Sequence, residues 1–460
     1  MVWSVLERSL VLLLRGASRL LLALLSLAQS FGPRNVRPVP PAVRPLLLLS
    51  GVELARRIRQ KQIKCVDVIQ EYISRIRDVN PIINAVVAER FAAALKEAKE
   101  VDNRIAEGGE DVKSLEESVP YLGVPFTVKE AIALEGGEGC IIAAAGSVMG
   151  VGSDIGGSIR MPAFFNGIYG HKPTTGLVPN GGQFPNATGR KAEFLCTGPM
   201  CRYVEDLIPM LKVMAGPNIS KVKLDEEVFI KKVKFYSMEH DGGSPFVSKV
   251  DSELIRAQRK LTEYLEVQFG VQVQQVQIHK MKYAFQIWSA MMVSPETDGK
   301  ESRSFKELMA DHGKEIRPLW ELVKKILGLS PHTIPAIGLV ITEDLAKANH
   351  QSNVKLMNMS RNLQNEFSNL LGDDGVFLYP SHPKIAPRHH HPKLMPFNFA
   401  YTAIFNVLGL PVTQCPLGLS KDGLPLGIQL VANHHNDHLC LRVAQHLECA
   451  FGGWRNPGAP

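Results

Sequence analysis

The hydrophobic positions beyond residue 50 predict helices and strands in alternation. Apolar residues recur at helical spacing from Cys65 to Pro81, and residues 89–107 form another helical stretch rich in Ala, Glu and Lys. Strand-like runs such as "VKFYSM", "GVFLYP" and "PLGIQLV" then alternate with helical runs such as "SELIRAQRKLTEYLE". Alternation over this length predicts an α/β fold, with one large mixed sheet covered by helices on both faces.

Local signals place the element boundaries around the polar motifs. Ser50 and Glu53 form a capping-box pattern at a helix start, and Asn80-Pro81 is expected to stop the next helix. We further expect a buried strand over residues 121–128, a buried helix over 140–149, and a helix over 159–166 with Gly167 as its C-terminal cap.

The first 31 residues carry two apolar runs, Leu10–Leu14 and Leu20–Ala28, separated by Arg15 and Arg19. Neither run reaches the ~20 apolar residues of a plain bilayer span. The arginines share one helix face, which predicts a membrane-associated helix lying in the interface; a tilted transmembrane span and a signal or transit peptide are the alternatives. Residues 32–45 hold five prolines and are expected to form a stiff linker to one domain over 46–460.

Composition argues against a nucleic-acid-binding protein and against a disulfide-stabilised one. The net charge of +7 is small for 460 residues and no dense basic tract is present, so nucleic-acid binding is not expected. Seven scattered cysteines without a CxxC pair indicate free thiols in a reducing compartment. We expect no cofactor and no metal; the run His389–His391 is most simply a polar loop, with a metal site as the alternative.

The segment "GSDIGGSIR", residues 152–160, has the pattern of a nucleophile site. Ser158 follows two glycines and opens a predicted helix, where backbone N–H groups and the helix N-terminus favour an anion. A serine there can attack a carbonyl while the N–H groups of Ile155, Gly156, Gly157 and Ser158 hold the oxyanion. The simpler alternative is that Ser158 only caps the helix.

A nucleophilic serine needs a base, and Lys129 is the candidate. Lys129 ends an apolar run, and burial at such a place lowers the pKa of a lysine toward the neutral range. A solvated strand end is the alternative interpretation of Lys129. The chain has no Gly-x-Ser-x-Gly elbow, and its histidines lie in no triad context.

Taken together, "GVPFTVKE" and "GSDIGGSIRMPAFFNGIYGHKP" resemble the amidase signature family, serine hydrolases of amide bonds, and the likeness runs from about Leu46 to the C-terminus. Within that family, "EHDGGS" and "DDGVFLYPSHP" resemble the fatty-acid amide hydrolases. The resemblance implies Ser158 as nucleophile, Lys129 as base, and the backbone of Ile155 to Ser158 as oxyanion hole. It also implies a membrane enzyme that cleaves fatty acid primary amides and N-acyl ethanolamines.

One stretch departs from the family pattern. Members carry a bridging serine in a Gly-Gly-Ser-Ser-Gly-Gly-Glu-Gly stretch, several dozen residues after the lysine. Only the second half is present here, as Gly136–Gly139, and Leu134 and Glu135 stand at the serine positions. Leu134 cannot relay a proton, and Glu135 beside Lys129 would raise the lysine pKa. An internal deletion near residues 130–136 would also leave a sheet edge unpaired.

A last pattern is an apolar helix face that bears on how a substrate enters. In residues 317–341, Leu319, Leu322, Val323, Ile326 and Leu327 share one helix face. A core-facing helix is one interpretation; the resemblance implies instead a membrane-facing cap beside an acyl-chain entrance.

The sequence therefore predicts a serine amidase that acts on lipid-like amides at an intracellular membrane, at the endoplasmic reticulum or a lipid-droplet surface. Two alternatives stay open: a catalytically impaired, membrane-associated isoform without the bridging serine, and an unrelated amidase that uses a histidine. A homodimer is also left open.

Overall fold

The computed structural model describes Gly16, Leu21 and residues 37–129, 137–183, 187, 189–294, 304–309, 316–332, 334–347 and 350–458. Apart from Gly16 and Leu21, the predicted membrane helix over 1–31 lies outside these residues, as does the stretch 130–136. No helix in the described part of the chain has both the length and the apolar character that crossing a membrane requires.

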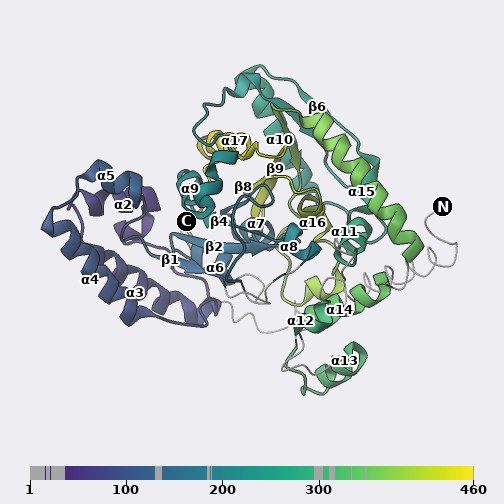
Figure 1. Ribbon diagram of the computed structural model, residues 1–460, viewed down its shortest axis with the longest axis horizontal. Coiled ribbons are helices and arrows are strands. Elements are labelled where there is room, and N and C mark those ends of the chain that lie inside the picture. The colour runs from purple at the N-terminus through teal and green to yellow at the C-terminus, as the bar shows by residue number, and fades with distance from the viewer. Residues whose placement is uncertain are drawn as a thin grey trace.

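A mixed sheet forms the centre of the molecule, as the sequence predicts (Figure 1). Its described strands lie in the order β1-β2-β4-β3-β8-β9-β7-β5-β6. Strand β1 runs parallel to β2, and β5 runs parallel to both β6 and β7, while the other neighbouring pairs are antiparallel. The strands are β1 (Phe126–Val128), β2 (Met149–Asp154), β3 (Tyr169–Lys172), β4 (Cys196–Cys201), β5 (Lys234–Ser237), β6 (Val273–Gln275), β7 (Gly375–Tyr379), β8 (Val412–Leu419) and β9 (Pro425–Ala432).

Helices cover both faces of this sheet, and the alternation of side chains along the strands shows how. In β7, Val376 and Leu378 join one hydrophobic cluster while Phe377 and Tyr379 join another. The first cluster packs against α9 (Leu207–Ala215), α10 (Ser252–Phe269) and α17 (Asp437–Phe451). The second packs against α11 (Ala284–Met292), α15 (His350–Leu371) and α16 (Ala400–Val407). The predicted two-faced α/β architecture is therefore confirmed.

In the described part of the chain, four helices near the N-terminus lie to one side of the sheet, at the purple end of the chain in Figure 1. They are α2 (Gly51–Arg59), α3 (Cys65–Ile83), α4 (Phe91–Glu107) and α5 (Val112–Ser118). Ser50 caps α2 as predicted, by accepting a hydrogen bond from Glu53 N. The predicted stop at Pro81 is wrong, because α3 continues to Ile83 and ends at Asn84 in the left-handed conformation.

The described end of the proline-rich linker is held against the domain. Arg75 donates a hydrogen bond to the Pro40 carbonyl at 2.7 Å. Ala42 exchanges two hydrogen bonds with the Asn456 side chain, at 2.9 and 2.8 Å. The segment that precedes the domain therefore starts from a fixed point beside the C-terminal tail.

The structure corrects the expected buried strand over 121–128. Only Phe126–Val128 is a strand, and Phe126 and Val128 are 58% and 63% exposed. Among the described residues β1 pairs with β2 alone, so its outer edge and these apolar side chains are uncovered. The helix expected over 140–149 is also shorter, since α6 spans Gly137–Ala143 and β2 begins at Met149.

Two helices begin in the stretch 317–341, α13 (Pro318–Ile326) and α14 (Ile334–Lys347). On α13 and just after it, Leu319, Val323 and Leu327 are 71%, 43% and 64% exposed, and Trp320 is 57% exposed. The interpretation of this face as core-facing is therefore wrong.

Candidate active site

Strand β2 and helix α7 (Arg160–Asn166) hold the predicted nucleophile between them. Ser158 lies in the short loop that follows Asp154, at the start of α7, and its side chain is partly exposed. Gly167 ends α7 in the left-handed conformation, as predicted. This strand-to-helix turn therefore places the partly exposed Ser158 at the end of the sheet.

The predicted base lies at the end of the neighbouring strand. Lys129 directly follows β1, and its backbone N–H bonds the Val151 carbonyl of β2 at 3.0 Å. Its amine donates to the Ser153 carbonyl at 3.2 Å rather than to the Ser158 hydroxyl. Burial lowers the pKa of Lys129, against the opposing charges of Asp154 and Glu138. The structure thus brings Lys129 and Ser158 to the same end of β1 and β2, but the Lys129 amine makes its hydrogen bond to Ser153 and not to Ser158.

Side chains from distant helices fix the backbone of the Ser158 loop. Trp288 Nε1 donates to the Ile155 carbonyl at 3.0 Å, and Thr402 Oγ1 donates to the Gly156 carbonyl at 2.7 Å. Because a trans peptide points its C=O and the following N–H in opposite directions, these contacts turn the N–H groups of Gly156 and Gly157 away from α11 and α16. Gly157 can adopt its φ of +123° because it carries no side chain.

The backbone N–H groups predicted to form the oxyanion hole point in different directions in the structure. The Gly157 N–H donates to Asp154 Oδ1 at 2.6 Å, so in this conformation it points to a carboxylate rather than to a substrate. The Gly157 carbonyl accepts from Met161 N at 2.7 Å, which turns the Ser158 N–H the opposite way. The assignment of Ile155, Gly156 and Gly157 as the oxyanion hole stays a prediction.

Beneath the loop lies a buried polar network that the sequence did not single out. Arg160 donates to both carboxylate oxygens of Asp154 at 3.0 Å, to Asn406 Oδ1 at 2.6 Å and to the Thr402 carbonyl at 2.8 Å. Burial alone would raise the pKa of Asp154, but the charge of Arg160 outweighs it and holds that pKa below its usual range. The signal was present as Asp154 and Arg160 flanking an otherwise uncharged stretch.

The bridging group implied by the family resemblance cannot be placed, because Leu134 and Glu135 lie outside the described residues. The nearest acid downstream is Glu138 in α6, which accepts a hydrogen bond from Thr127 Oγ1. Burial raises the pKa of Glu138 to about 7, although the Thr127 hydrogen bond and the Lys129 charge act in the opposite direction. Sequence reasoning assigned this electrostatic role to Glu135 and overlooked Glu138.

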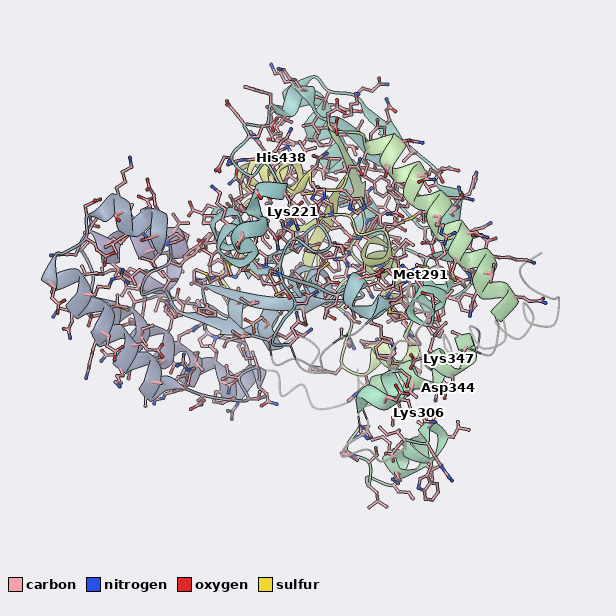
Figure 2. All side chains as sticks on the ribbon, viewed as in Figure 1. Lys221, Met291, Lys306, Asp344, Lys347 and His438 are labelled. Carbon is pink, nitrogen blue, oxygen red and sulfur yellow. The ribbon has the colours of Figure 1, made fainter. Side chains whose placement is uncertain are left out.

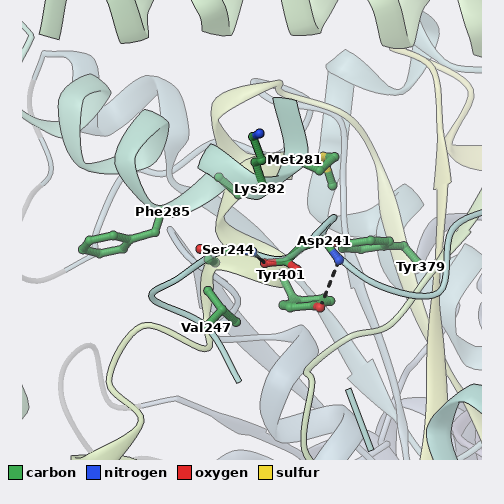
Figure 3. A pocket seen from close by; sticks show the side chains of 10 residues that line it. Asp241, Ser244, Val247, Met281, Lys282, Phe285, Tyr379 and Tyr401 are labelled. Atoms are coloured by element: carbon green, nitrogen blue, oxygen red, sulfur yellow. Dashed lines mark hydrogen bonds between the residues drawn. The ribbon is translucent and has the colours of Figure 1, made fainter. Parts of the chain in front are cut away.

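The loop "EHDGGS" contributes to the scaffold of the site. Figure 3 shows it lining a small hollow, where the Asp241 N–H donates to the Tyr401 hydroxyl at 3.1 Å. Tyr401 also stacks on Tyr379, with ring centroids 5.0 Å apart. Because Tyr401 precedes Thr402 in α16, these contacts help to hold the helix that supports the Ser158 loop.

Histidine chemistry finds little support in this part of the molecule. His171 is fully buried, and its ring nitrogens lie 2.8 Å from Thr413 Oγ1 and 3.2 Å from Asp437 Oδ1. Burial lowers the pKa of His171, which favours the neutral ring. A residue enclosed in this way serves packing, because substrate cannot reach it. In the described part of the chain, no three His, Cys, Asp or Glu side chains converge as metal ligands would.

Comparison with known proteins agrees with this arrangement. The family model described as Amidase matches residues 135–441. This chain belongs to the amidase signature family. Membership makes it an amide-hydrolysing enzyme by family.

Its relatives in the amidase signature family include two named proteins of similar sequence. Human fatty-acid amide hydrolase 2 is 51% identical over 498 positions, covering 93% of this chain and 94% of the relative. Zebrafish (Danio rerio) fatty-acid amide hydrolase 2-A is 48% identical over 524 positions and covers 98% of both chains. A solved fatty acid amide hydrolase shares the fold, with a TM-score of 0.66 at 18% identity over 90% of this chain and 87% of that one.

The alignment lengths bear on the predicted deletion. Since 98% of 460 residues is about 451, an alignment of 524 positions leaves about 73 of them without a residue of this chain. The Amidase match begins at residue 135, the second of the two positions where the family pattern has serine. An internal deletion near residues 130–136 stays a prediction.

Proposed function

We propose that this amidase hydrolyses fatty acid amides, both primary amides and N-acyl ethanolamines, through an acyl-enzyme on Ser158. The observation that carries the proposal is that Ser158, partly exposed, and Lys129, whose pKa burial lowers, lie at the same end of β1 and β2. The substrate class is suggested by the names of the similar relatives, which are fatty-acid amide hydrolases.

In the proposed reaction the Ser158 oxygen bonds to the amide carbonyl carbon, and its proton passes to the neutral amine of Lys129. The tetrahedral intermediate then expels ammonia or ethanolamine, which takes that proton, and an acyl ester stays on Ser158. Water attacks the ester, so that fatty acid and the free hydroxyl form. Backbone N–H groups of the loop would stabilise the negative charge on the carbonyl oxygen.

The test is hydrolysis of a chain-length series of primary amides, from acetamide to oleamide, by the full chain in detergent micelles. We expect turnover that rises with chain length and is lost in Ser158→Ala. Equal turnover in Ser158→Ala would reject the proposed nucleophile, and activity on acetamide alone would reject the lipid substrate.

One observation favours the second candidate, a catalytically impaired isoform. The Lys129 amine bonds the Ser153 carbonyl, and a hydrophobic Leu134 stands where the family carries a serine. Insertion of a full Gly-Gly-Ser-Ser-Gly-Gly segment with its upstream residues would then raise turnover by orders of magnitude. An inserted variant no faster than the original chain would speak against this candidate.

We further propose that the enzyme works at an intracellular membrane, at the endoplasmic reticulum or a lipid-droplet surface. The apolar residues 1–31 and the exposed face of α13 support this idea. Lys347, labelled in Figure 2, lies at the end of α14, which packs against α13. Its exposed charge suits the headgroups of anionic lipids.

Deletion of residues 1–30 is expected to move the protein from the membrane pellet to the supernatant. Unchanged partitioning would reject the N-terminal anchor. Replacing Leu319, Trp320 and Leu327 together by Ser in the shortened chain then tests α13, which should account for any membrane binding that is left.

A further inference from the structure

Glu138 lies in the first turn of α6 with 9% of its surface exposed, and its carboxyl group faces β1 and β2. Thr127 Oγ1 donates a hydrogen bond to Glu138 Oε1. A methyl group added at Gly150 would stand 1.9 Å from the same oxygen, so the carboxyl group rests directly on the β2 backbone. Contacts on two strands therefore hold the carboxyl group in one place.

The same surface carries the predicted base. Lys129 directly follows β1, two residues after Thr127, and its backbone continues the pairing with β2, so the two side chains leave the chain on the same side. The Lys129 backbone N–H donates to the Val151 carbonyl and so extends the register in which Thr127 lies opposite Gly150. Lys129 is thus two residues along from the Thr127–Gly150 pair that holds the Glu138 carboxyl group. The two groups act on each other through their charges: each favours the ionised form of the other.

We propose that Glu138 is a positioning residue that controls the charge of Lys129. The inference deepens the proposed function and rests on it for the role of Lys129 as base. An ionised Glu138 stabilises the Lys129 ammonium and withholds the free amine, whereas a neutral Glu138 releases it.

Among the described residues, Asp154 and Arg75 also carry charge on the elements around α6, and both are bound elsewhere. From β2, Asp154 also favours the Lys129 ammonium, but its carboxylate is bound by Arg160 of α7. From α3, Arg75 donates to the Ala144 carbonyl, beyond the last residue of α6 and away from Glu138 in the first turn. Glu138 is thus the charged group on α6 that is free to change the state of Lys129.

The test measures the amine directly, without substrate turnover. The full chain is treated briefly with acetic anhydride between pH 6 and 10, and acetylation of Lys129 is followed by peptide mass spectrometry. In Glu138→Gln we expect Lys129 to react roughly three- to tenfold faster near pH 8, because loss of the carboxylate favours the neutral amine. Glu138→Asp, which restores a carboxylate, should return the rate toward the original value.

Controls separate this role from a general loosening of the structure. Acetylation of the exposed Lys113 in α5 should be equal in all variants, and so should that of Lys129 in Glu116→Gln, which removes a carboxylate on α5. Thr127→Val keeps the acid but removes its hydrogen bond, and should accelerate Lys129 less than Glu138→Gln does. An unchanged Lys129 rate in both Glu138→Gln and Thr127→Val would overturn the inference. A faster Lys129 without any turnover would leave the inference intact and reject the proposed function.

Discussion

Arg160 and Asp154 form an ion pair with both side chains fully buried, 3.0 Å apart, directly beneath the loop that carries Ser158. Asp154 also accepts a hydrogen bond from the Gly157 N–H. The ion pair therefore links the interior of the domain to the backbone of the candidate site. A buried pair contributes most visibly when one partner is removed, because the other charge is then left uncompensated.

Arg160→Met is therefore expected to lower the free energy of unfolding by about 3–5 kcal/mol. Urea denaturation followed by circular dichroism measures this loss. Arg104→Met is the matched control, because it breaks an exposed pair with Glu110 at 2.7 Å and should change stability little. Similar losses in the two variants would contradict the role assigned to the buried pair.

Gly157→Ala tests how tightly the loop is held. A Cβ at this position would lie 2.0 Å from Thr402 Oγ1, and the φ of +123° is strained for any other residue. We expect a loss of about 2 kcal/mol or more, together with loss of Ser158 reactivity. Gly181→Ala is the control, since a Cβ there meets nothing within 4 Å. A fully stable and reactive Gly157→Ala would show that the loop is free to adjust.

His382 should make stability depend on pH. Burial lowers its pKa to about 4 in the folded protein, so between pH 6.5 and 4 the unfolded chain binds a proton that the folded one does not. The stabilisation is present above pH 6.5 and is lost as the pH falls to 4, by up to about 3 kcal/mol. The difference in unfolding free energy between the original chain and His382→Gln should therefore shrink over this range. A constant difference would contradict the assigned pKa.

The uncovered β1 edge is expected to promote self-association. Phe126 and Val128 are exposed on a strand whose described neighbour lies on one side only. Replacing them by Thr and Lys should change stability by less than about 0.5 kcal/mol, since neither is buried. Light scattering at rising protein concentration should then show fewer aggregates. Equal scattering by the original chain and the double variant would show that the β1 edge does not promote self-association.

Local sequence patterns predicted most of the helices and strands. Helix α7 with its Gly167 cap and the strands β5, β7 and β9 follow directly from the spacing of apolar residues. The errors occurred where long-range packing decides: α3 passes through Pro81, and the apolar residues 121–128 do not form a buried strand. No periodic signal distinguishes a buried strand from an exposed edge strand.

The candidate site was only partly predictable for the same reason. Ser158 and Lys129 belong to recognisable motifs, but Trp288, Thr402 and Asn406, which hold the loop, lie more than 100 residues away in the sequence. Single-sequence patterns contain no information about such pairings. Glu138 was overlooked because its burial depends on the packing of α6 against β2.

The most direct test of the central claim is labelling of the full-length chain with a fluorophosphonate, which reacts only with an activated serine. Mass spectrometry of the intact protein and its peptides locates the adduct, with Ser158→Ala as the negative control and Lys129→Met as the test of the base. We predict one adduct on Ser158 that forms at least ~100-fold more slowly without Lys129. Folded protein that carries no adduct on Ser158, or that labels equally fast in Lys129→Met, would contradict a serine–lysine amidase site in this chain.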